Sequence, residues 1–143
     1  MDGTEVIGAC LAEEFEKRGF YNTNQHNTIY VITPEYNMNN QLFFRDNLVG
    51  AIKGKNVILL LATTTTGLTV GRSMECIQYY GGQLQGVSSL FSTVKSVNGT
   101  RINAVFTEED VPGYAAYEAK DCPFCKKGIR LEAMVNGFGY SRF

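Results

Sequence analysis

Four consecutive threonines after an apolar run form the pattern with the clearest chemistry in this chain. The run 57–62 leads directly into Thr63, Thr64, Thr65, Thr66, Gly67 and, one residue later, Thr69. A polar turn between a buried strand and a helix presents backbone N–H groups and hydroxyls, and the helix dipole adds about half a positive charge. These residues therefore predict a phosphate-binding loop, and the alternative is a polar strand end without a ligand.

A second pattern with possible chemistry is a pair of cysteines near the C-terminus. Cys122 and Cys125 have the spacing of half a zinc site or of a redox pair. Tetrahedral zinc needs four ligands, and the further candidates are Cys10, Cys76 and the single histidine, His26. Three interpretations stay open: a turn with free thiols, a zinc site that two subunits can share, and a reactive or disulfide pair.

Two common nucleotide-binding patterns are absent. Gly67 is followed by Gly71, Arg72 and Ser73, one residue too close for a Walker loop and with Arg in place of Lys. The pattern GxGxxG does not occur. If the threonine loop binds phosphate, it does so through hydroxyls and backbone amides.

The length and composition of the chain describe a compact protein with little net charge. The 143 residues suffice for one domain, and a net charge of -1 predicts no general attraction to nucleic acid or to an anionic membrane surface. No apolar stretch approaches the ~20 residues of a membrane span, and the N-terminus has no signal-peptide pattern. We therefore expect a cytoplasmic protein with four free thiols.

The elements that must position the loop follow from hydrophobic periodicity. Helices alternate with strands through the middle of the chain, which predicts an α/β fold with a mainly parallel sheet flanked by helices. Residues 34–41 read as a loop or hairpin, 42–52 as either strand or short helix, and the tail 112–143 as irregular. The predicted helices are 4–18 and 68–80, and the predicted strands are 28–33, 56–62, 84–91 and 101–106.

Three local features refine this prediction. The apolar face of helix 4–18 is expected to contain Val6, Ile7, Cys10, Leu11 and Phe15. The pair Asn98-Gly99 predicts a hairpin turn. No strand precedes the first helix although the alternation calls for one, so Asp2, Gly3 and Thr4 resemble a strand-to-helix turn that has lost its strand.

The segment VILLLATTTTGLTV resembles the phosphoribosyl pyrophosphate (PRPP) motif of the type I phosphoribosyltransferases. Thr65, Thr66, Gly67 and Thr69 stand where that family has its Thr-Thr-Gly and following Thr. Lys53-Gly54-Lys55 and the tail DCPFCKKGIRLEA are similar to segments of orotate phosphoribosyltransferases and their relatives. On this basis the chain is identified as an orotate phosphoribosyltransferase-like protein, with a single domain over 1–143 and a Cys-containing tail over 112–143.

The resemblance implies a function in nucleotide metabolism. In that family the 5-phosphate of PRPP binds in the threonine loop, and a base nitrogen displaces pyrophosphate at the anomeric carbon, usually with Mg²⁺. By position, Asp2, Gly3 and Thr4 correspond to the end of the pyrophosphate loop. The implied partners are a phosphorylated ribose or nucleotide, with orotate the nearest base, and a second copy of the chain in a homodimer.

The chain departs from the family at two positions that matter for catalysis. Leu61 and Ala62 replace the two acidic residues that contact the ribose hydroxyls, and residues 34–47 contain only Arg45 as a cation where the family has a lysine-bearing loop. Losing one transition-state contact costs on the order of 3 kcal/mol. The sequence therefore leaves three functions open: a phosphoribosyltransferase, a non-catalytic phosphate- or nucleotide-binding member, and a CxxC zinc or redox module.

Overall fold

The structure is a computed structural model that describes residues 4–20, 28–117, 120–136 and 138–143. The chain divides into two compact units, Met1–Pro112 and Gly113–Phe143. None of the helices in the described part of the chain combines the length and apolar character that a bilayer crossing requires.

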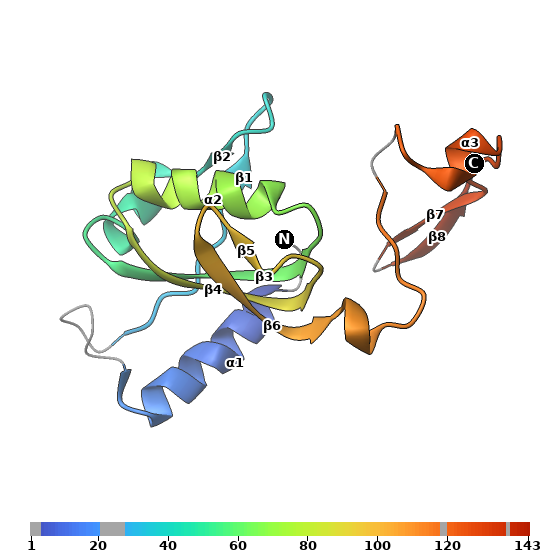
Figure 1. The fold of residues 1–143 in the computed structure, drawn as a ribbon. Helices are drawn as coiled ribbons and strands as arrows, with labels where there is room; N and C mark the ends of the chain where they lie inside the picture. The colour runs from blue at the N-terminus through green and yellow to red at the C-terminus, as the bar shows by residue number, and fades with distance from the viewer. Residues whose placement is uncertain (1–3, 21–27, 118–119, 137) are drawn as a thin grey trace. The chain divides into compact units, whose positions relative to one another are not determined.

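The first unit is built on a four-stranded sheet (Figure 1). Strands β3 (Asn56–Thr64), β4 (Gln83–Ser92) and β6 (Thr100–Thr107) are parallel, and β5 (Ser96–Val97) pairs antiparallel with β6. The spatial order is β3-β4-β6-β5, so β4 and β6 are the interior strands and β3 lies at an edge. This architecture confirms the predicted α/β class with a mostly parallel sheet and is compatible with a phosphoribosyltransferase-like fold.

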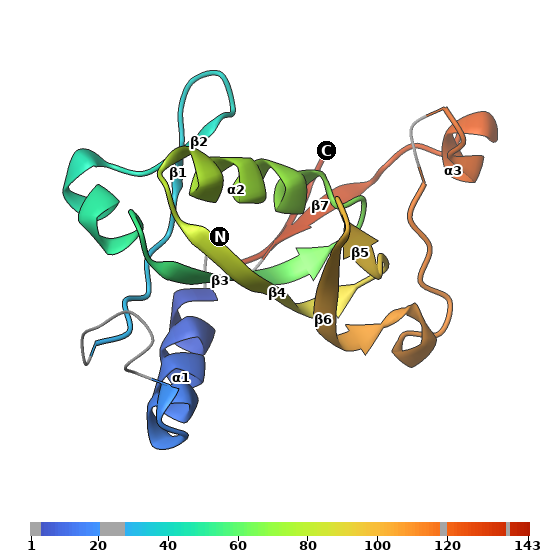
Figure 2. The same cartoon turned by 60° about the vertical axis from the view of Figure 1, so that its left-hand side comes forward.

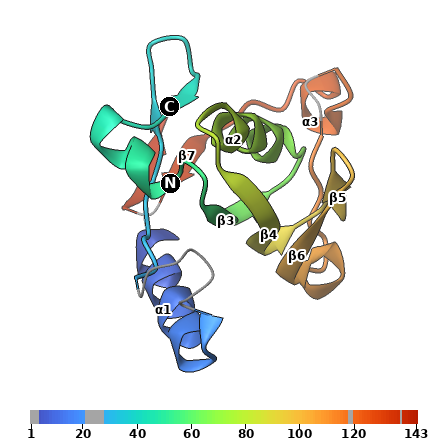
Figure 3. The same cartoon turned by 90° about the vertical axis from the view of Figure 1, so that its left-hand side faces the viewer.

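Two helices pack on opposite sides of β3 (Figures 1 and 3). Helix α2 (Leu68–Tyr79) covers one face, where its Val70 packs with Leu61, Val87 and Ile102 in the buried core. Helix α1 (Thr4–Lys17) lies on the other side, and a Cβ atom on Gly8 would stand 3.8 Å from Leu60. Because successive strand residues point to opposite faces, Leu60 and Leu61 serve different helices.

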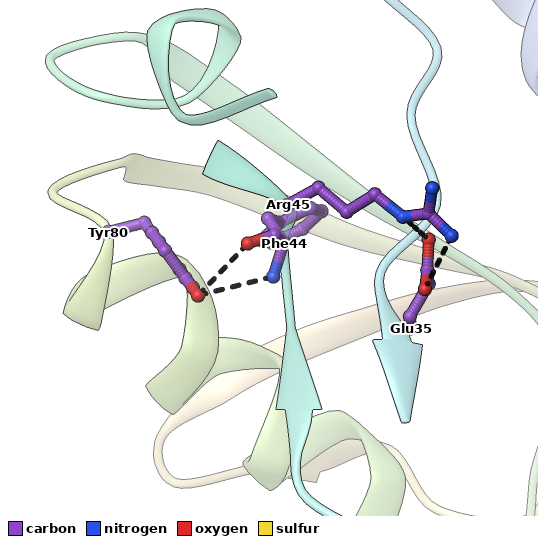
Figure 4. A network of polar contacts seen from close by, with 4 residues as sticks. All are labelled: Glu35, Phe44, Arg45 and Tyr80. Carbon is purple, nitrogen blue, oxygen red and sulfur yellow. Dashed lines mark hydrogen bonds and ion pairs between the residues drawn. The ribbon is translucent and has the colours of Figure 1, made fainter. Parts of the chain in front are cut away.

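A small hairpin lies against α2 (Figure 2). Strands β1 (Glu35–Tyr36) and β2 (Leu42–Phe43) pair antiparallel and lead into a 3₁₀ helix over Asp46–Ala51. The Tyr80 hydroxyl donates to the Phe44 carbonyl at 3.2 Å and accepts from the Phe44 amide at 3.3 Å (Figure 4). Arg45 forms an exposed ion pair with Glu35. Residues 42–52 are therefore strand and short helix in succession, which resolves their ambiguity.

Most predicted elements are confirmed, with shifts of a few residues at their ends. The hairpin at Asn98-Gly99 is also confirmed: it joins β5 to β6, and both residues have positive φ, 48° and 77°. Local signals suffice here because a long apolar run or an Asn-Gly turn restricts the backbone by itself.

Three expectations are wrong in whole or in part. Residues 28–33 form no strand, although they are rich in β-branched side chains. On α1 the expected face is only partly right: Ile7, Leu11 and Phe15 are half-buried, as is Ala12, but Val6 is 70% exposed and Cys10 is exposed. The expected helix face was shifted because it was inferred without knowing where β3 lies.

The third wrong expectation concerns the tail. The second unit contains a short helix α3 (Pro123–Lys126) and an antiparallel hairpin of β7 (Ala133–Asn136) and β8 (Gly139–Arg142). It is therefore not irregular. Residues 113–143 nonetheless bury little apolar surface, since Leu131, Val135 and Phe138 are all more than three-quarters exposed.

Candidate functional site

The threonine loop connects the carboxyl end of β3 to the start of α2. Strand β3 ends at Thr64, residues 65–67 form a bend, and α2 begins at Leu68. Thr65 and Thr66 are exposed, while Gly67 is buried with a φ of 77° in the left-handed region. The strand–loop–helix arrangement expected from the sequence is thus present. It places two exposed hydroxyls beside the first turn of a helix, whose leading N–H groups have no intrahelical acceptor.

Residues 93–97, which comprise the connection after β4 and strand β5, hold this loop in place. The Thr93 hydroxyl donates to the Thr65 carbonyl at 2.7 Å, and the Thr93 amide donates to the Thr64 carbonyl at 3.0 Å. Val97 packs against Gly67 so closely that a Cβ atom there would lie 2.5 Å from its Cγ2 atom. Three contacts from one neighbouring segment therefore define the backbone path of the loop.

Thr93 and Val97, which position the loop, are residues that sequence reasoning missed. The sequence contained a signal for them. The Asn98-Gly99 turn predicts that the chain reverses soon after the strand 84–91, so the residues between that strand and the turn should lie at its carboxyl end. The carboxyl ends of neighbouring parallel strands meet at one edge of the sheet. The residues that follow β4 must therefore lie beside the residues that follow β3.

The four threonines do not share one environment. Thr64 is only 4% exposed, and its hydroxyl donates to the Ser89 hydroxyl at 3.4 Å. Thr63 is exposed at the end of the strand. Thr66 accepts a long 3.5 Å hydrogen bond from the Leu68 amide. A group bound at the bend would therefore meet Thr65 and Thr66, while the hydroxyl of Thr64 already bonds within the sheet.

Cations and a helix dipole near the start of α2 favour an anion, and carboxylates lie farther along the same end of the sheet. The first turn of α2 carries no acidic residue, and the first acidic residue of that helix is Glu75. Arg72 on α2 and Lys95 in the β4–β5 connection are exposed and form no ion pair within the described residues. The positive end of the helix dipole adds to them at the loop, while the carboxylates of Glu108–Asp110 follow β6 at the same end of the sheet.

The proposed pyrophosphate-loop residues are described only in part. Thr4 begins α1 and lines the same cavity as Thr69 in α2. Asp2 and Gly3 lie outside the described residues, as does His26. The first turns of two helices thus border a common cavity, which has a volume of about 540 Å³.

The two positions that carry acidic residues in the family motif hold apolar residues here, and their side chains are buried or half-buried. Leu61 is 4% exposed and belongs to the core between β3 and α2, in contact with Val70. Ala62 is half-buried and follows it in the strand. A carboxylate at position 61 would displace a core side chain, so positions 61 and 62 supply no acidic group for a ribose or a cation.

Cys122 and Cys125 lie in the second unit, at the two ends of one turn. Cys122 precedes α3 and Cys125 lies within it. A hydrogen bond from the Cys125 backbone amide lowers the pKa of the Cys122 thiol, and the neighbouring Cys122 sulfur raises the pKa of the Cys125 thiol. The two cysteines therefore interact through hydrogen bonding, and the Cys122 thiol is the one that ionises more readily.

The other two cysteines have contrasting surroundings. Cys76 is buried, donates to the Leu42 carbonyl, and has its thiol pKa raised by burial. Cys10 is exposed on α1. Within the residues that the structure describes, no three His, Cys, Asp or Glu side chains come together as a metal site. Zinc at Cys122 and Cys125 stays a prediction.

Comparison with known proteins supports a relationship to one enzyme family. No family model matches the chain. It is 35% identical over 78 residues to an orotate phosphoribosyltransferase of Pelotomaculum thermopropionicum, which is 53% of this chain and 39% of that protein. The chain thus matches less than half the length of that relative. The α/β sheet, the loop after β3 and this match agree in supporting a phosphoribosyltransferase-like relationship.

Proposed function

We propose that this protein binds the 5-phosphate of a phosphoribosyl compound or nucleotide at residues 63–69. The observation that supports this most strongly is the loop between β3 and α2. Its backbone is held by Thr93 and Val97, while Thr65 and Thr66 remain exposed beside the N-terminus of α2. An ordered loop loses little entropy on binding, and helix N-termini are favourable phosphate sites.

Binding without turnover is the form of this function that the site favours. Leu61 and Ala62 offer no carboxylate to the ribose hydroxyls or to a developing positive charge. Hard cations such as Mg²⁺ prefer carboxylate oxygens, and residues 56–69 contain none. We therefore propose that magnesium reaches the site only as a counter-ion of pyrophosphate in PRPP. From the similarity to an orotate phosphoribosyltransferase, we propose that orotate or a related pyrimidine is the base of the bound nucleotide.

The wider setting follows from the same relationship. We propose a role in nucleotide metabolism, in the cytoplasm and as a homodimer, with a small phosphorylated molecule as the principal partner. The alternative is a zinc or redox function of Cys122 and Cys125. It is favoured by the lowered pKa of the Cys122 thiol and would be supported by stoichiometric zinc in the purified protein.

A calorimetric titration separates these functions. We expect ribose 5-phosphate, PRPP with magnesium, and orotidine 5-phosphate to bind in the same site, and the nucleoside orotidine to bind far more weakly because it lacks the phosphate. Pyrophosphate release from PRPP and orotate should be at background. Turnover would show catalysis instead of binding alone, and equal affinity for the phosphorylated and unphosphorylated nucleoside would contradict the loop assignment.

A further inference from the structure

Cys122 and Cys125 stand at the two ends of a single turn, at a separation that suits a disulfide. The Lys126 amide donates to the Cys122 carbonyl at 3.1 Å, which closes the turn around both cysteines. Residues three positions apart in a helical turn have Cα atoms about 5 Å apart, and disulfides usually join Cα atoms about 4.4–6.8 Å apart. The two side chains already hydrogen-bond to each other, so a bond between the sulfurs requires little backbone movement.

The groups around Cys122 stabilise a negative charge on its sulfur. The backbone amides of Cys125 and Phe124 donate to this sulfur, and Lys126 adds a positive charge nearby. Pro123 has no N–H and begins the turn with a fixed φ, which leaves those two amides as the donors. The thiolate is the form of cysteine that attacks a disulfide. The sequence Cys-Pro-Phe-Cys-Lys thus favours attack by its first cysteine, with the second one in reach.

Access and pairing distinguish these two cysteines from the others. Cys125 is exposed and Cys122 half-buried, whereas Cys76 is buried and donates its thiol proton to a carbonyl. Cys10 is exposed, but no second cysteine lies near it in the sequence of α1. Within the described residues no third His, Cys, Asp or Glu completes a metal-binding group with the pair. The contact that each of the two sulfurs does make is with the other.

We propose that Cys122 and Cys125 form a reversible dithiol–disulfide pair whose substrates are low-molecular-weight disulfides of the glutathione type. This inference develops the redox function of the cysteine pair and does not depend on phosphate binding by the first unit. Disulfides of proteins in reducing compartments are usually transient and serve catalysis or redox sensing. A pair that is accessible and joined by a single turn fits such a sensing role.

The exchange consists of two steps. The Cys122 thiolate, whose proton has gone to solvent, attacks one sulfur of the small disulfide. The S–S bond of that molecule breaks, one small thiolate leaves, and a mixed disulfide forms at Cys122. The Cys125 thiol then releases its proton, its sulfur attacks the Cys122 sulfur, and the second small thiolate leaves. The protein loses two electrons and two protons, and one small disulfide becomes two thiols.

The test uses the full chain, reduced and treated with a chelator, in mixtures of glutathione and glutathione disulfide. Trypsin cleaves after Lys120 and Lys126, so both cysteines fall in the single peptide 121–126. Mass spectrometry should show that oxidation removes two hydrogens from this peptide and that excess glutathione restores them. Cys10 lies in a different peptide and serves as the matched single thiol.

The dependence on total glutathione identifies an internal disulfide. An internal disulfide releases two thiols for each small disulfide consumed, and a mixed disulfide releases one. At a fixed ratio of the two forms of glutathione, doubling their total concentration should therefore halve the ratio of disulfide to dithiol in peptide 121–126. The mixed disulfide at Cys10 should not change.

Two variants test the order of attack. Cys125→Ser should stop the exchange at the mixed disulfide on Cys122. Cys122→Ser should slow the reaction of the remaining thiol by about tenfold, because the Cys125 sulfur lacks the amide donors. Equal rates in the two variants would overturn the assignment of Cys122 as the attacking residue.

Three further outcomes would overturn the proposal itself. They are mixed disulfides on both cysteines without an internal bond, an oxidised fraction that is independent of total glutathione, and stoichiometric zinc that blocks oxidation when the chelator is omitted. The last would assign the pair to a metal site. Ribose 5-phosphate titration of the same reduced protein tests the phosphate site separately, so the failure of either proposal is recognised without the other.

Discussion

The Thr93 hydroxyl donates a 2.7 Å hydrogen bond to the Thr65 carbonyl and so joins the connection after β4 to the candidate phosphate loop. The contact spans 28 positions in sequence. It matters because Thr65 is exposed and precedes Gly67, where the backbone turns into α2. A loop tied at this point can present its hydroxyls and amides in one arrangement before a ligand arrives.

Thr93→Val should therefore weaken phosphate binding without a direct contact to the ligand. We expect a loss of about 1 kcal/mol in the free energy of unfolding and, at the loop, a fewfold weaker affinity for ribose 5-phosphate. Urea denaturation and calorimetric titration measure the two effects. Thr93→Ser keeps the hydroxyl and should behave like the original protein. A loss in Thr93→Ser with none in Thr93→Val would show that the methyl group, not the hydrogen bond, matters.

Gly67→Ala should destabilise the protein by about 2–4 kcal/mol. Part of this cost comes from a side chain in the left-handed region, about 1 kcal/mol, and the rest from overpacking against Val97, about 1–3 kcal/mol. Gly99→Ala is a matched control, because Gly99 also has a φ of 77° but no atom within 4 Å of its would-be Cβ.

The two contributions separate in a double-mutant cycle. In a Val97→Ala background, Gly67→Ala should cost only about 1 kcal/mol, since the steric contribution is gone. The free energies come from urea denaturation. Additive costs would contradict the close packing of Val97 on Gly67.

Thr66→Val tests the loop directly. If the Thr66 hydroxyl donates to the phosphate, its loss should weaken binding about tenfold or more, as expected for a hydrogen bond to a charged group. Thr64→Val is the comparison, because the Thr64 hydroxyl bonds to Ser89 inside the sheet. It should lower stability more than affinity. Unchanged affinity of Thr66→Val in a calorimetric titration would count against the assignment of the loop.

Restoring the acidic pair at Leu61 and Ala62 should not create a transferase. Leu61→Asp places an unpaired carboxylate in the core against Val70 and should cost about 3 kcal/mol or more. Ala62→Asp lies at a half-buried position and should cost less. We expect no pyrophosphate release from PRPP and orotate in the double variant, measured with a coupled assay, because residues 34–47 supply no lysine. Measurable turnover would refute this.

The cysteine pair should differ in reactivity in a pH-dependent way. The pKa of the Cys122 thiol is lowered by the hydrogen bond from the Cys125 amide, and the pKa of the Cys125 thiol is raised. Thiolates are the reacting species, so as pH rises Cys122 should be alkylated by iodoacetamide first. Mass spectrometry of digested protein after short exposures over pH 6–9 gives both rates.

Two variants check this assignment. Cys125→Ser keeps the backbone amide and should leave the reactivity of Cys122 largely in place, whereas Cys125→Pro removes the donor and should slow it. Faster alkylation of Cys125 in the original protein at neutral pH would contradict the direction of both pKa shifts.

Much of the first unit could be predicted because its signals are local. The apolar run of β3, the helical stripe that includes Val70 and Ile77, and the Asn98-Gly99 turn each restrict the backbone within a few residues. The position of the loop between β3 and α2 follows from these elements alone. So does its likeness to a phosphate site, since strand, bend and helix start are consecutive in the chain.

Other features required contacts between distant residues. Local composition could not predict that Thr93 and Val97 hold the loop, because this contact depends on how two strands lie side by side. It also could not predict that the Thr64 hydroxyl bonds to Ser89 or that residues 28–33 form no strand. A β-strand exists only when a neighbour supplies hydrogen bonds along its edge, and which neighbour is present is a property of the folded chain. Local sequence thus determined which segments can form strands, helices and turns. Tertiary structure decided which edges are paired, because pairing depends on residues far away in sequence.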